Sequence, residues 1–309
     1  MRFRPAGLMA LLLLGGSALQ ALAAPCPAET FEETVIGCTE MIKMQRMDEE
    51  VLSRAHYNRG YALQGLGRNK EAIADFTNAI RFNPRNAAAY NNRGYLTAMS
   101  GNLDGALRDF NKAIELDPTL IQAFNNRAML FKTRNQWDKA IADYDAAIRL
   151  KDPKASVVYF NRGVAYQNKG DADQAIADYG EAIKLDGKEV NSLSNRGVLY
   201  AGKGDMDKAM ADFDEALRRD PRNVQALVNR GFTLYRQGNF NRAIADYDAA
   251  IAIEPRIARI FQNRAEAYEK KGDLVRALAD ANAALALDPR DKSAAALRTR
   301  LQAATKPAN

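Results

Sequence analysis

The sequence predicts an all-α solenoid in which seven helical hairpins stack one on the next. The tripeptide Asn-Arg-Gly or Asn-Arg-Ala recurs along the 309-residue chain at intervals of 34 residues, with one interval of 35. A fixed period of this length, in segments that lack strand-like alternation, indicates stacked pairs of helices. Most units also end in proline, which cannot continue a helix and biases the residue before it away from helical conformation.

The N-terminal residues 1–23 have the pattern of a secretory signal peptide. Arg2 and Arg4 give a basic start, residues 6–14 are almost entirely apolar, and Ala21-Leu22-Ala23 is a small-residue cleavage site. The apolar stretch is short for a membrane helix, which needs roughly 20 apolar residues. We therefore expect cleavage after Ala23 and a periplasmic or secreted bacterial protein without stable membrane insertion. Retention as an N-terminal anchor is the alternative.

Residues 24–52 form a predicted N-terminal cap that contains Cys26 and Cys38, the two cysteines of the chain. An even number of cysteines in an exported chain favours a disulfide, and closing this short loop contributes about 3 kcal/mol in the chain-entropy model. Two unrelated thiols are the alternative. Phe31 to Lys43 is interpreted as a degenerate half-repeat in which Cys38 lies near the aromatic position of a second helix.

The first hairpin, residues 53–86, shows the local signals that the others repeat. Its first helix (helix A) is expected over 53–66, and Gly67 permits the turn. In the second helix (helix B) apolar residues follow helical spacing: Ala72, Ile73, Phe76, Ala79 and Ile80. The further units are 87–120, 121–155, 156–189, 190–223, 224–257 and 258–291, and residues 292–309 are a C-terminal capping helix and tail.

Counted from the first residue of each unit, the residues at positions 8, 15, 20, 24, 27 and 32 resemble the tetratricopeptide repeat. This resemblance covers about residues 53–291. It implies a right-handed superhelix that acts as a non-catalytic scaffold for binding other proteins. The chief departure is arginine at position 7, where the family more often has leucine.

An asparagine occupies position 6 of every unit, and the units are similar to those of the repeat domain of O-linked N-acetylglucosamine transferase. The resemblance implies an asparagine ladder on the concave face that binds the backbone of an extended peptide. An amide suits this role because it both donates and accepts hydrogen bonds. The alternative is that each asparagine bonds a neighbouring repeat. The ladder comprises Asn58, Asn92, Asn126, Asn161, Asn195, Asn229 and Asn263.

Each position-7 arginine is followed sixteen residues later by an aspartate. This constant spacing across a hairpin predicts a repeated structural ion pair between helices A and B, or between helix B and the next helix A. Arginine suits such a partly buried pair because its planar guanidinium bonds a carboxylate in a bidentate way. The pairs are Arg59/Asp75, Arg93/Asp109, Arg127/Asp143, Arg162/Asp178, Arg196/Asp212, Arg230/Asp246 and Arg264/Asp280.

Position 9 varies from unit to unit, and three of its residues are aromatic: Tyr61, Tyr95 and Phe232. Variable apolar residues beside a constant ladder predict contacts with the apolar side chains of a bound peptide. Packing between repeats is the alternative.

Several function classes lack support in the sequence. The formal charge is +6, and without Arg2 and Arg4 it falls to +4, which is too small an excess to favour nucleic acid. The single histidine, His56, takes an inward position in the first hairpin and is expected to be a core residue. We expect no catalytic residue, metal site or cofactor, since the chain lacks the usual enzyme motifs.

The leading functional hypothesis is a cell-envelope scaffold that holds an extended segment of a protein or peptide partner in its concave groove. Two alternatives are a self-assembling structural scaffold and an adaptor that serves an envelope hydrolase or protease. The pattern specifies neither the partner nor the oligomeric state.

Overall fold

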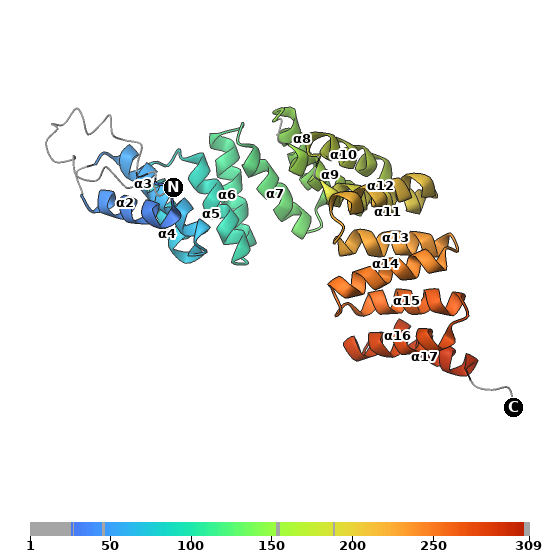
Figure 1. Cartoon of the computed structure of the whole chain (residues 1–309). Helices are drawn as coiled ribbons and strands as arrows, with labels where there is room; N and C mark the ends of the chain where they lie inside the picture. The colour runs from blue at the N-terminus through green and yellow to red at the C-terminus, as the bar shows by residue number, and fades with distance from the viewer. Residues whose placement is uncertain (1–25, 27, 45–46, 153–154, 188, 306–309) are drawn as a thin grey trace, which may run out of the picture. The chain divides into compact units, whose positions relative to one another are not determined.

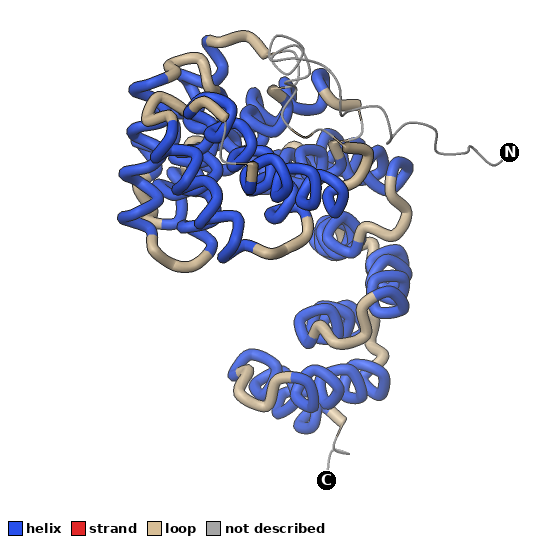
Figure 2. Tube along the Cα trace, turned by 90° about the vertical axis from the view of Figure 1, so that its left-hand side faces the viewer, coloured by secondary structure: helices blue, strands red, loops and turns tan. Residues whose placement is uncertain are grey.

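The structure is a computed structural model that describes residues 26, 28–44, 47–152, 155–187 and 189–305. The predicted signal peptide and its cleavage site lie outside these residues. The described part of the chain consists of helices α2 to α17 joined by short turns, with no strand (Figure 2). The prediction of an all-α repeat fold is thus confirmed. None of the described helices is both long and apolar enough to cross a membrane.

The chain divides into two compact units, Met1–Leu150 and Lys151–Asn309, which are described separately (Figure 1). The helices of unit 1 are α2 (Phe31–Lys43), α3 (Glu49–Gly65), α4 (Asn69–Phe82), α5 (Ala87–Met99), α6 (Leu103–Leu116), α7 (Ile121–Thr133) and α8 (Trp137–Arg149). Those of unit 2 are α9 (Ser156–Lys169), α10 (Ala172–Leu185), α11 (Val190–Lys203), α12 (Met206–Arg219), α13 (Val224–Arg236), α14 (Phe240–Ile253), α15 (Ala258–Lys270), α16 (Leu274–Leu287) and α17 (Lys292–Ala304).

Odd-numbered helices from α3 to α15 are the A helices, and each packs most closely on the B helix that follows it. A turn residue with left-handed backbone joins the two. It is glycine in six hairpins, as at Gly67 with φ 73°. In the third hairpin Asn135 takes this conformation with φ 55°. Asparagine tolerates the left-handed region better than other residues with a side chain, so the turn keeps its shape there.

The core of each hairpin depends on small residues that allow close helix approach. The alanine at position 20 of every repeat is fully buried, as at Ala72 and Ala243. Where position 8 is glycine, it faces the aromatic ring of helix B. A Cβ on Gly231 would lie 2.8 Å from Cε1 of Tyr247, which is too close without a shift of the ring. The aromatic ring of helix B and the missing side chain at position 8 of helix A therefore set the distance between the two helices of the hairpin.

Helix α3 begins at Glu49, four residues before the start expected from the repeat pattern. Asp48 provides the cap, since its side chain accepts a hydrogen bond from the Val51 amide at 2.8 Å. Two glutamates in the first turn, Glu49 and Glu50, also favour this start because the N-terminal end of a helix dipole is positive. The repeat period alone does not show this additional turn.

Candidate functional site

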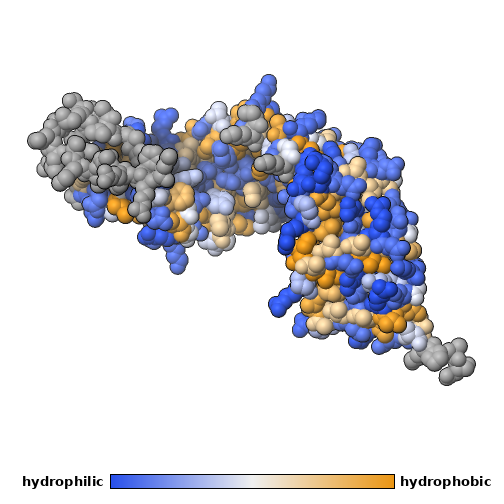
Figure 3. All heavy atoms as spheres, viewed as in Figure 1, coloured by the Kyte–Doolittle hydropathy of each residue, from blue (hydrophilic) through white to orange (hydrophobic). Residues whose placement is uncertain are grey.

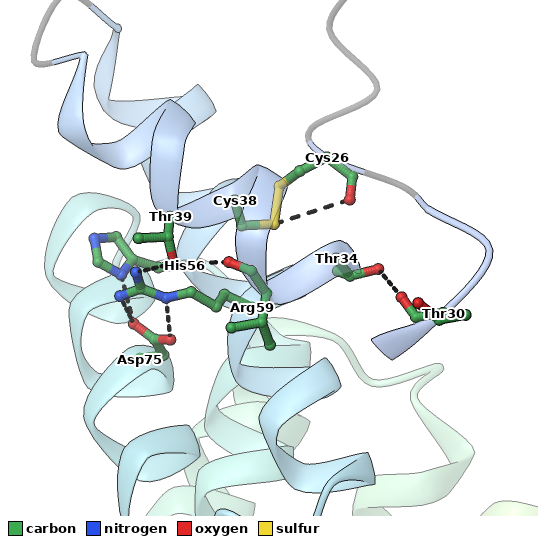
Figure 4. Close-up of a disulfide and its surroundings, with 9 residues drawn as sticks. Cys26, Thr30, Thr34, Cys38, Thr39, His56, Arg59 and Asp75 are labelled. Atoms are coloured by element: carbon green, nitrogen blue, oxygen red, sulfur yellow. Dashed lines mark hydrogen bonds and ion pairs between the residues drawn. A yellow bond between two sulfur atoms is a disulfide. The ribbon is translucent and has the colours of Figure 1, made fainter. Parts of the chain in front are cut away.

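The arginine of helix A and the aspartate of helix B meet within the same hairpin in all seven repeats. In the first, Arg59 Nε donates to Asp75 Oδ2 at 2.7 Å and Nη2 donates to Oδ1 at 2.8 Å (Figure 4). The other six pairs have the same bidentate geometry, with distances of 2.6–2.9 Å. They are Arg93/Asp109, Arg127/Asp143, Arg162/Asp178, Arg196/Asp212, Arg230/Asp246 and Arg264/Asp280. Of the two arrangements that the spacing allowed, the structure thus has the pair between helices A and B of one hairpin.

The aspartates of these pairs are more deeply buried than the arginines. The expectation was a partly buried pair, which describes the arginines, whose side chains are 18–22% exposed. The aspartates, in contrast, are buried and only 3–8% exposed: Asp75, Asp109, Asp143, Asp178, Asp212, Asp246 and Asp280. Each pair is thus buried at its aspartate end and partly exposed at its arginine end.

The close approach of the two helices explains this burial. A Cβ built on Gly60 of α3 would lie 3.2 Å from the Cβ of Asp75, and one built on Gly94 of α5 would lie 3.1 Å from the Cβ of Asp109. The Cβ of the aspartate therefore lies between the two helices, and the side chain is too short for its carboxylate to reach solvent. The arginine is longer, so its guanidinium reaches the carboxylate from the edge of the contact. A buried carboxylate needs such a partner, because a buried unpaired charge is costly.

In at least five repeats the third guanidinium nitrogen bonds the B helix before the hairpin. Arg127 Nη1 donates to Asn111 Oδ1 at 2.7 Å, and Arg230 Nη1 donates to Asp214 Oδ1 at 2.7 Å. The same contact joins Arg59 to Thr39, Arg93 to Thr77 and Arg264 to Asp248. Each of these arginines therefore connects three helices, both within its hairpin and to the preceding B helix.

Gly180 stands at the equivalent place before Arg196, so there is no side chain to accept the third contact. A Cβ built there would lie 3.4 Å from Arg196 Nη1. Helix α10 thus lacks the side-chain acceptor through which other B helices bond the arginine of the next hairpin.

The first pair includes the single histidine. His56 is buried, and its Nδ1 lies 2.8 Å from Asp75 Oδ1 while its ring stacks on Phe82 at 5.6 Å. Burial raises the pKa of Asp75, but the hydrogen bonds from Arg59 and His56 outweigh burial and hold this pKa below its ordinary value. The Asp75 carboxylate consequently stays ionised and bonded to both side chains.

The asparagine ladder of unit 1 takes part in bonds between repeats. Asn126 Nδ2 donates to Asn91 Oδ1 at 2.9 Å, and Asn91 Nδ2 donates to Asn92 Oδ1 at 3.0 Å. Asn92 Nδ2 in turn donates to the Tyr57 hydroxyl at 3.3 Å. This chain of hydrogen bonds crosses α7, α5 and α3, so two ladder amides are engaged within the protein.

In unit 2 the ladder is bonded differently. Asn195 Nδ2 lies 3.4 Å from the Tyr179 hydroxyl, which itself donates to Gln167 Oε1 at 2.6 Å. Asn229 Oδ1 accepts a hydrogen bond from Gln225 of its own helix at 3.0 Å. The sequence did not indicate the partners of these asparagines, because their contacts do not recur in every repeat.

The remaining ladder residues differ in exposure. Asn161 of α9 is buried and only 8% exposed, so its amide is not open to a peptide as the ladder hypothesis expected. Asn58 of α3 and Asn263 of α15 are half-buried. Identical residues at position 6 thus have different surroundings, because the side chains of the adjacent repeats differ.

The position-9 residues on the A helices are mostly exposed. Tyr61 is 54% exposed and Phe232 is 47% exposed, and Tyr95, Met129 and Val198 are also on the surface. Hydrophobic and hydrophilic residues lie interspersed on the visible face of each unit (Figure 3). We call the exposed and half-buried residues at positions 2, 6 and 9 the A-helix face.

Tyr61 has a neighbour that the sequence did not indicate. Its ring contacts Phe31 of α2 edge to face, with the ring centroids 6.3 Å apart. The N-terminal cap therefore covers part of the A-helix face in the first repeat.

The expected disulfide between Cys26 and Cys38 is present, with the Cα atoms 5.1 Å apart (Figure 4). Cys38 of α2 is fully buried. The bond therefore ties the segment before α2 to the helix that covers the N-terminal end of unit 1.

Among the described residues, two of the hollows each lie within one unit. One of about 270 Å³ lies among α2, α3 and α4, and its charged groups Arg59, Asp75, Arg68 and Glu71 are all paired. A more open one of about 670 Å³ is lined by Tyr235, Glu266, Glu269, Lys270 and Arg300. Within the described ranges, no group of three or more His, Cys, Asp or Glu side chains could hold a metal ion.

Family models identify the repeat. Models described as tetratricopeptide repeat match residues 57–121, 125–190 and 160–224, and others match 213–245 and 258–291. A further model described as TPR repeat matches 233–272. The chain belongs to the tetratricopeptide repeat family. No curated protein matches the chain.

Solved structures share the fold at low identity. The Cut9-Hcn1 hetero-tetramer of APC/C matches with a TM-score of 0.63 and 19% identity over 88% of this chain. The chain spans 52% of the length of that protein. A tetratricopeptide repeat protein from Parabacteroides merdae matches with a TM-score of 0.60 and 20% identity, over 81% of this chain and 98% of that one. YrrB, described as a TPR protein with an unusual peptide-binding site, matches with a TM-score of 0.50 and 24% identity, over 58% of this chain and 92% of that one.

Proposed function

We propose that this protein is an exported, non-catalytic interaction scaffold whose A-helix face binds an extended segment of a partner protein. The observation that carries the proposal is a contrast within each repeat. The arginine–aspartate pair is the same in all seven repeats, whereas the exposed residues beside it differ from repeat to repeat. A constant frame with a variable surface is how solenoids present a long binding site.

The ladder residues best able to bind a ligand are those of the last two repeats of unit 2, Asn229 and Asn263. In unit 1 the amides of Asn92 and Asn126 already donate to neighbouring repeats. Asn229 instead accepts from its own helix, and among the described residues its two N–H groups have no acceptor. Asn229, Asn263 and the exposed Phe232 together offer amide groups for a peptide backbone and an aromatic surface for its side chains.

Export is proposed from the signal-like N-terminal residues and supported by the disulfide. Disulfides persist in the periplasm and outside the cell but are rare in the cytosol. A likeness in fold to YrrB, whose description names a peptide-binding site, is compatible with a peptide ligand.

Affinity capture tests this function. Wild-type protein and an Asn229→Ala/Asn263→Ala variant would serve as baits for an envelope extract, and captured proteins would be identified by mass spectrometry. Binding of the identified segment, made as a synthetic peptide, would then be measured by calorimetry. We expect the double variant to bind at least tenfold more weakly, since two hydrogen bonds at about 1 kcal/mol each correspond to roughly 2 kcal/mol.

Asn241→Ala is the matched control, because Asn241 is an exposed asparagine on helix B of the same unit. It should bind as wild type does. Equal binding by the wild type and the double variant would remove the ladder from the binding site.

A further inference from the structure

The hollow among α2, α3 and α4 lies beside a position that holds an aromatic ring in other repeats. Position 11 of helix A lines this hollow in the first repeat, where it is Leu63. In four other repeats the side chain at position 11 is aromatic, and its ring centroid lies 5.8–6.0 Å from the guanidinium carbon of the paired arginine. These rings belong to Phe131, Tyr166, Tyr200 and Tyr268. The first repeat has the arginine, Arg59, without the ring, and because leucine is shorter than these side chains, part of that space stays open.

Helix α2 leaves more room at the hollow than the other B helices would. Thr39 accepts from Arg59 Nη1, as position 25 of the preceding B helix does in other repeats. In this register Val35 takes position 21, where the B helices of the seven repeats have the larger isoleucine, leucine or methionine. Val35 and Leu63 both line the hollow of about 270 Å³. This volume is close to the lower end of pockets that hold small ligands, which is about 300 Å³.

The charged groups that line the hollow are bonded to one another. Arg59 is bonded to Asp75 and Thr39 (Figure 4). Arg68 donates to both carboxylate oxygens of Glu71 at 2.7–2.8 Å. These hydrogen bonds lie in the plane of each guanidinium, so its faces remain available for stacking. Two arginines and two acidic residues have no net charge, which disfavours an ion, whereas a neutral aromatic ring fits because its face attracts a guanidinium.

Asn78 of α4 gives the hollow a polar group that suits a peptide. Its side chain lines the hollow and is half-buried, and its amide has no hydrogen-bond partner among the described residues. Position 26 is asparagine in the first repeat and in none of the other six. An amide both donates and accepts, so it matches the peptide group next to an aromatic side chain. A single ring gains little affinity by itself, so the occupant is best a ring that belongs to a larger partner.

We propose that this hollow binds a phenylalanine or tyrosine side chain of a partner protein. The ring takes the place that position-11 rings have in other repeats, against Leu63, Val35 and the guanidinium face of Arg59. Asn78 bonds the peptide group next to that ring. The hollow shares no residue with the A-helix face, so it is a second contact with a protein partner, and either site can fail without the other.

NMR titration of the full chain with N-acetyl-L-phenylalanine amide tests the proposal. We expect saturable shifts of the Val35 and Leu63 methyl signals, with a Kd on the order of 1 mM or weaker, as one ring and one amide contact allow. The N-acetyl-cyclohexylalanine amide has a similar shape without the aromatic electrons. It should bind about two- to fivefold more weakly, because it loses the attraction to the guanidinium.

Leu63→Phe supplies the first repeat with the ring that other repeats have, and it should abolish the shift of the Val35 methyl signals because the hollow is filled. The matched control is Leu234→Phe, the same change at position 11 of the sixth repeat. It should bind the amide as wild type does. Circular dichroism should show native helix content in both variants, since four repeats already carry a ring at this position.

Asn78→Ala separates a peptide occupant from a free aromatic molecule. It should weaken binding of N-acetyl-L-phenylalanine amide about fivefold, as the loss of one hydrogen bond predicts. Benzyl alcohol has the ring without the peptide groups, so it should bind wild type and Asn78→Ala equally. The proposal would be overturned if the Val35 signals did not shift, if Leu63→Phe bound as wild type does, if the cyclohexyl analogue bound as tightly, or if Asn78→Ala left binding of the amide unchanged.

Discussion

At the scale of single residues, the arginine–aspartate pair is the most uniform feature of the molecule. The spacing of sixteen residues indicated which residues to examine. The structure adds that the aspartates are buried and that at least five arginines also reach the preceding B helix. The carboxylates have little contact with water, so the arginines rather than solvent stabilise their charge. Loss of the aspartate should therefore have a larger effect than loss of the outer acceptor.

Replacing Asp246 with alanine tests this difference. The change leaves two donors of Arg230 without their carboxylate, and breaking a buried pair in this way costs about 3–5 kcal/mol. Asp214→Ala removes the outer acceptor, whose side chain is 53% exposed, and should cost about 1 kcal/mol or less. Urea unfolding followed by circular dichroism measures both. Equal shifts in the two midpoints would contradict the buried role of Asp246.

Acid should weaken the first hairpin through Asp75. Arg59 and His56 hold its pKa below the unfolded value of about 3.9, so the folded state binds this proton less tightly than the unfolded state. The stabilisation is complete above that pH and is lost as the pH falls through the lower, folded pKa.

The measurement is the thermal midpoint of wild type and of Asp75→Asn between pH 6 and pH 2. Wild type should be the more stable at pH 6, and the difference between the two should shrink as the pH falls below about 4. A difference that stays constant down to pH 2 would show that the Asp75 charge contributes nothing.

At the scale of helices, local rules recur in each repeat, and for this reason the hairpins were predictable. Turn glycines, buried alanines and facing aromatic rings follow from sequence periodicity alone. Contacts that occur once were not predictable. Asp48 lengthens α3 by one turn, and Tyr179 reaches Asn195 only because a hydroxyl replaces the hydrogen of phenylalanine at that position. Such interactions depend on three-dimensional proximity that the repeat period does not contain.

Gly180→Asp is expected to stabilise the junction between α10 and α11. Aspartate favours helix over glycine by a few tenths of a kcal/mol, and it would supply Arg196 with the acceptor that Asp214 gives Arg230. An exposed pair adds up to about 1 kcal/mol, so the thermal midpoint should rise by about 2–4 °C. Gly180→Ala is the control, because its gain from helix propensity should persist in 1 M salt while part of the aspartate gain disappears. A lower midpoint for the aspartate variant would refute this account of α10.

At the scale of the whole molecule, the chain combines a repeated frame with a surface that changes along its length. The frame was largely predictable, because the family marks recur in seven units. The division after Leu150 was not indicated by the sequence, where the extra residue of the third repeat appeared as a tolerated insertion.

The binding surface was predictable only in part. Tyr61, Tyr95 and Phe232 are exposed, as binding residues must be. Two ladder asparagines instead bond neighbouring repeats, and Asn161 is buried. The repeat period places all seven asparagines alike, but their access to a ligand depends on side chains that vary between repeats.

Site-specific photo-crosslinking in living cells tests most directly whether the A-helix face binds the partner. A photoreactive phenylalanine analogue would replace Phe232 on helix A, or Val275 on helix B, which is 78% exposed in the same unit. The account predicts a crosslinked partner from position 232 and none from position 275. A partner crosslinked from position 275 alone would contradict it and would place binding on the B helices.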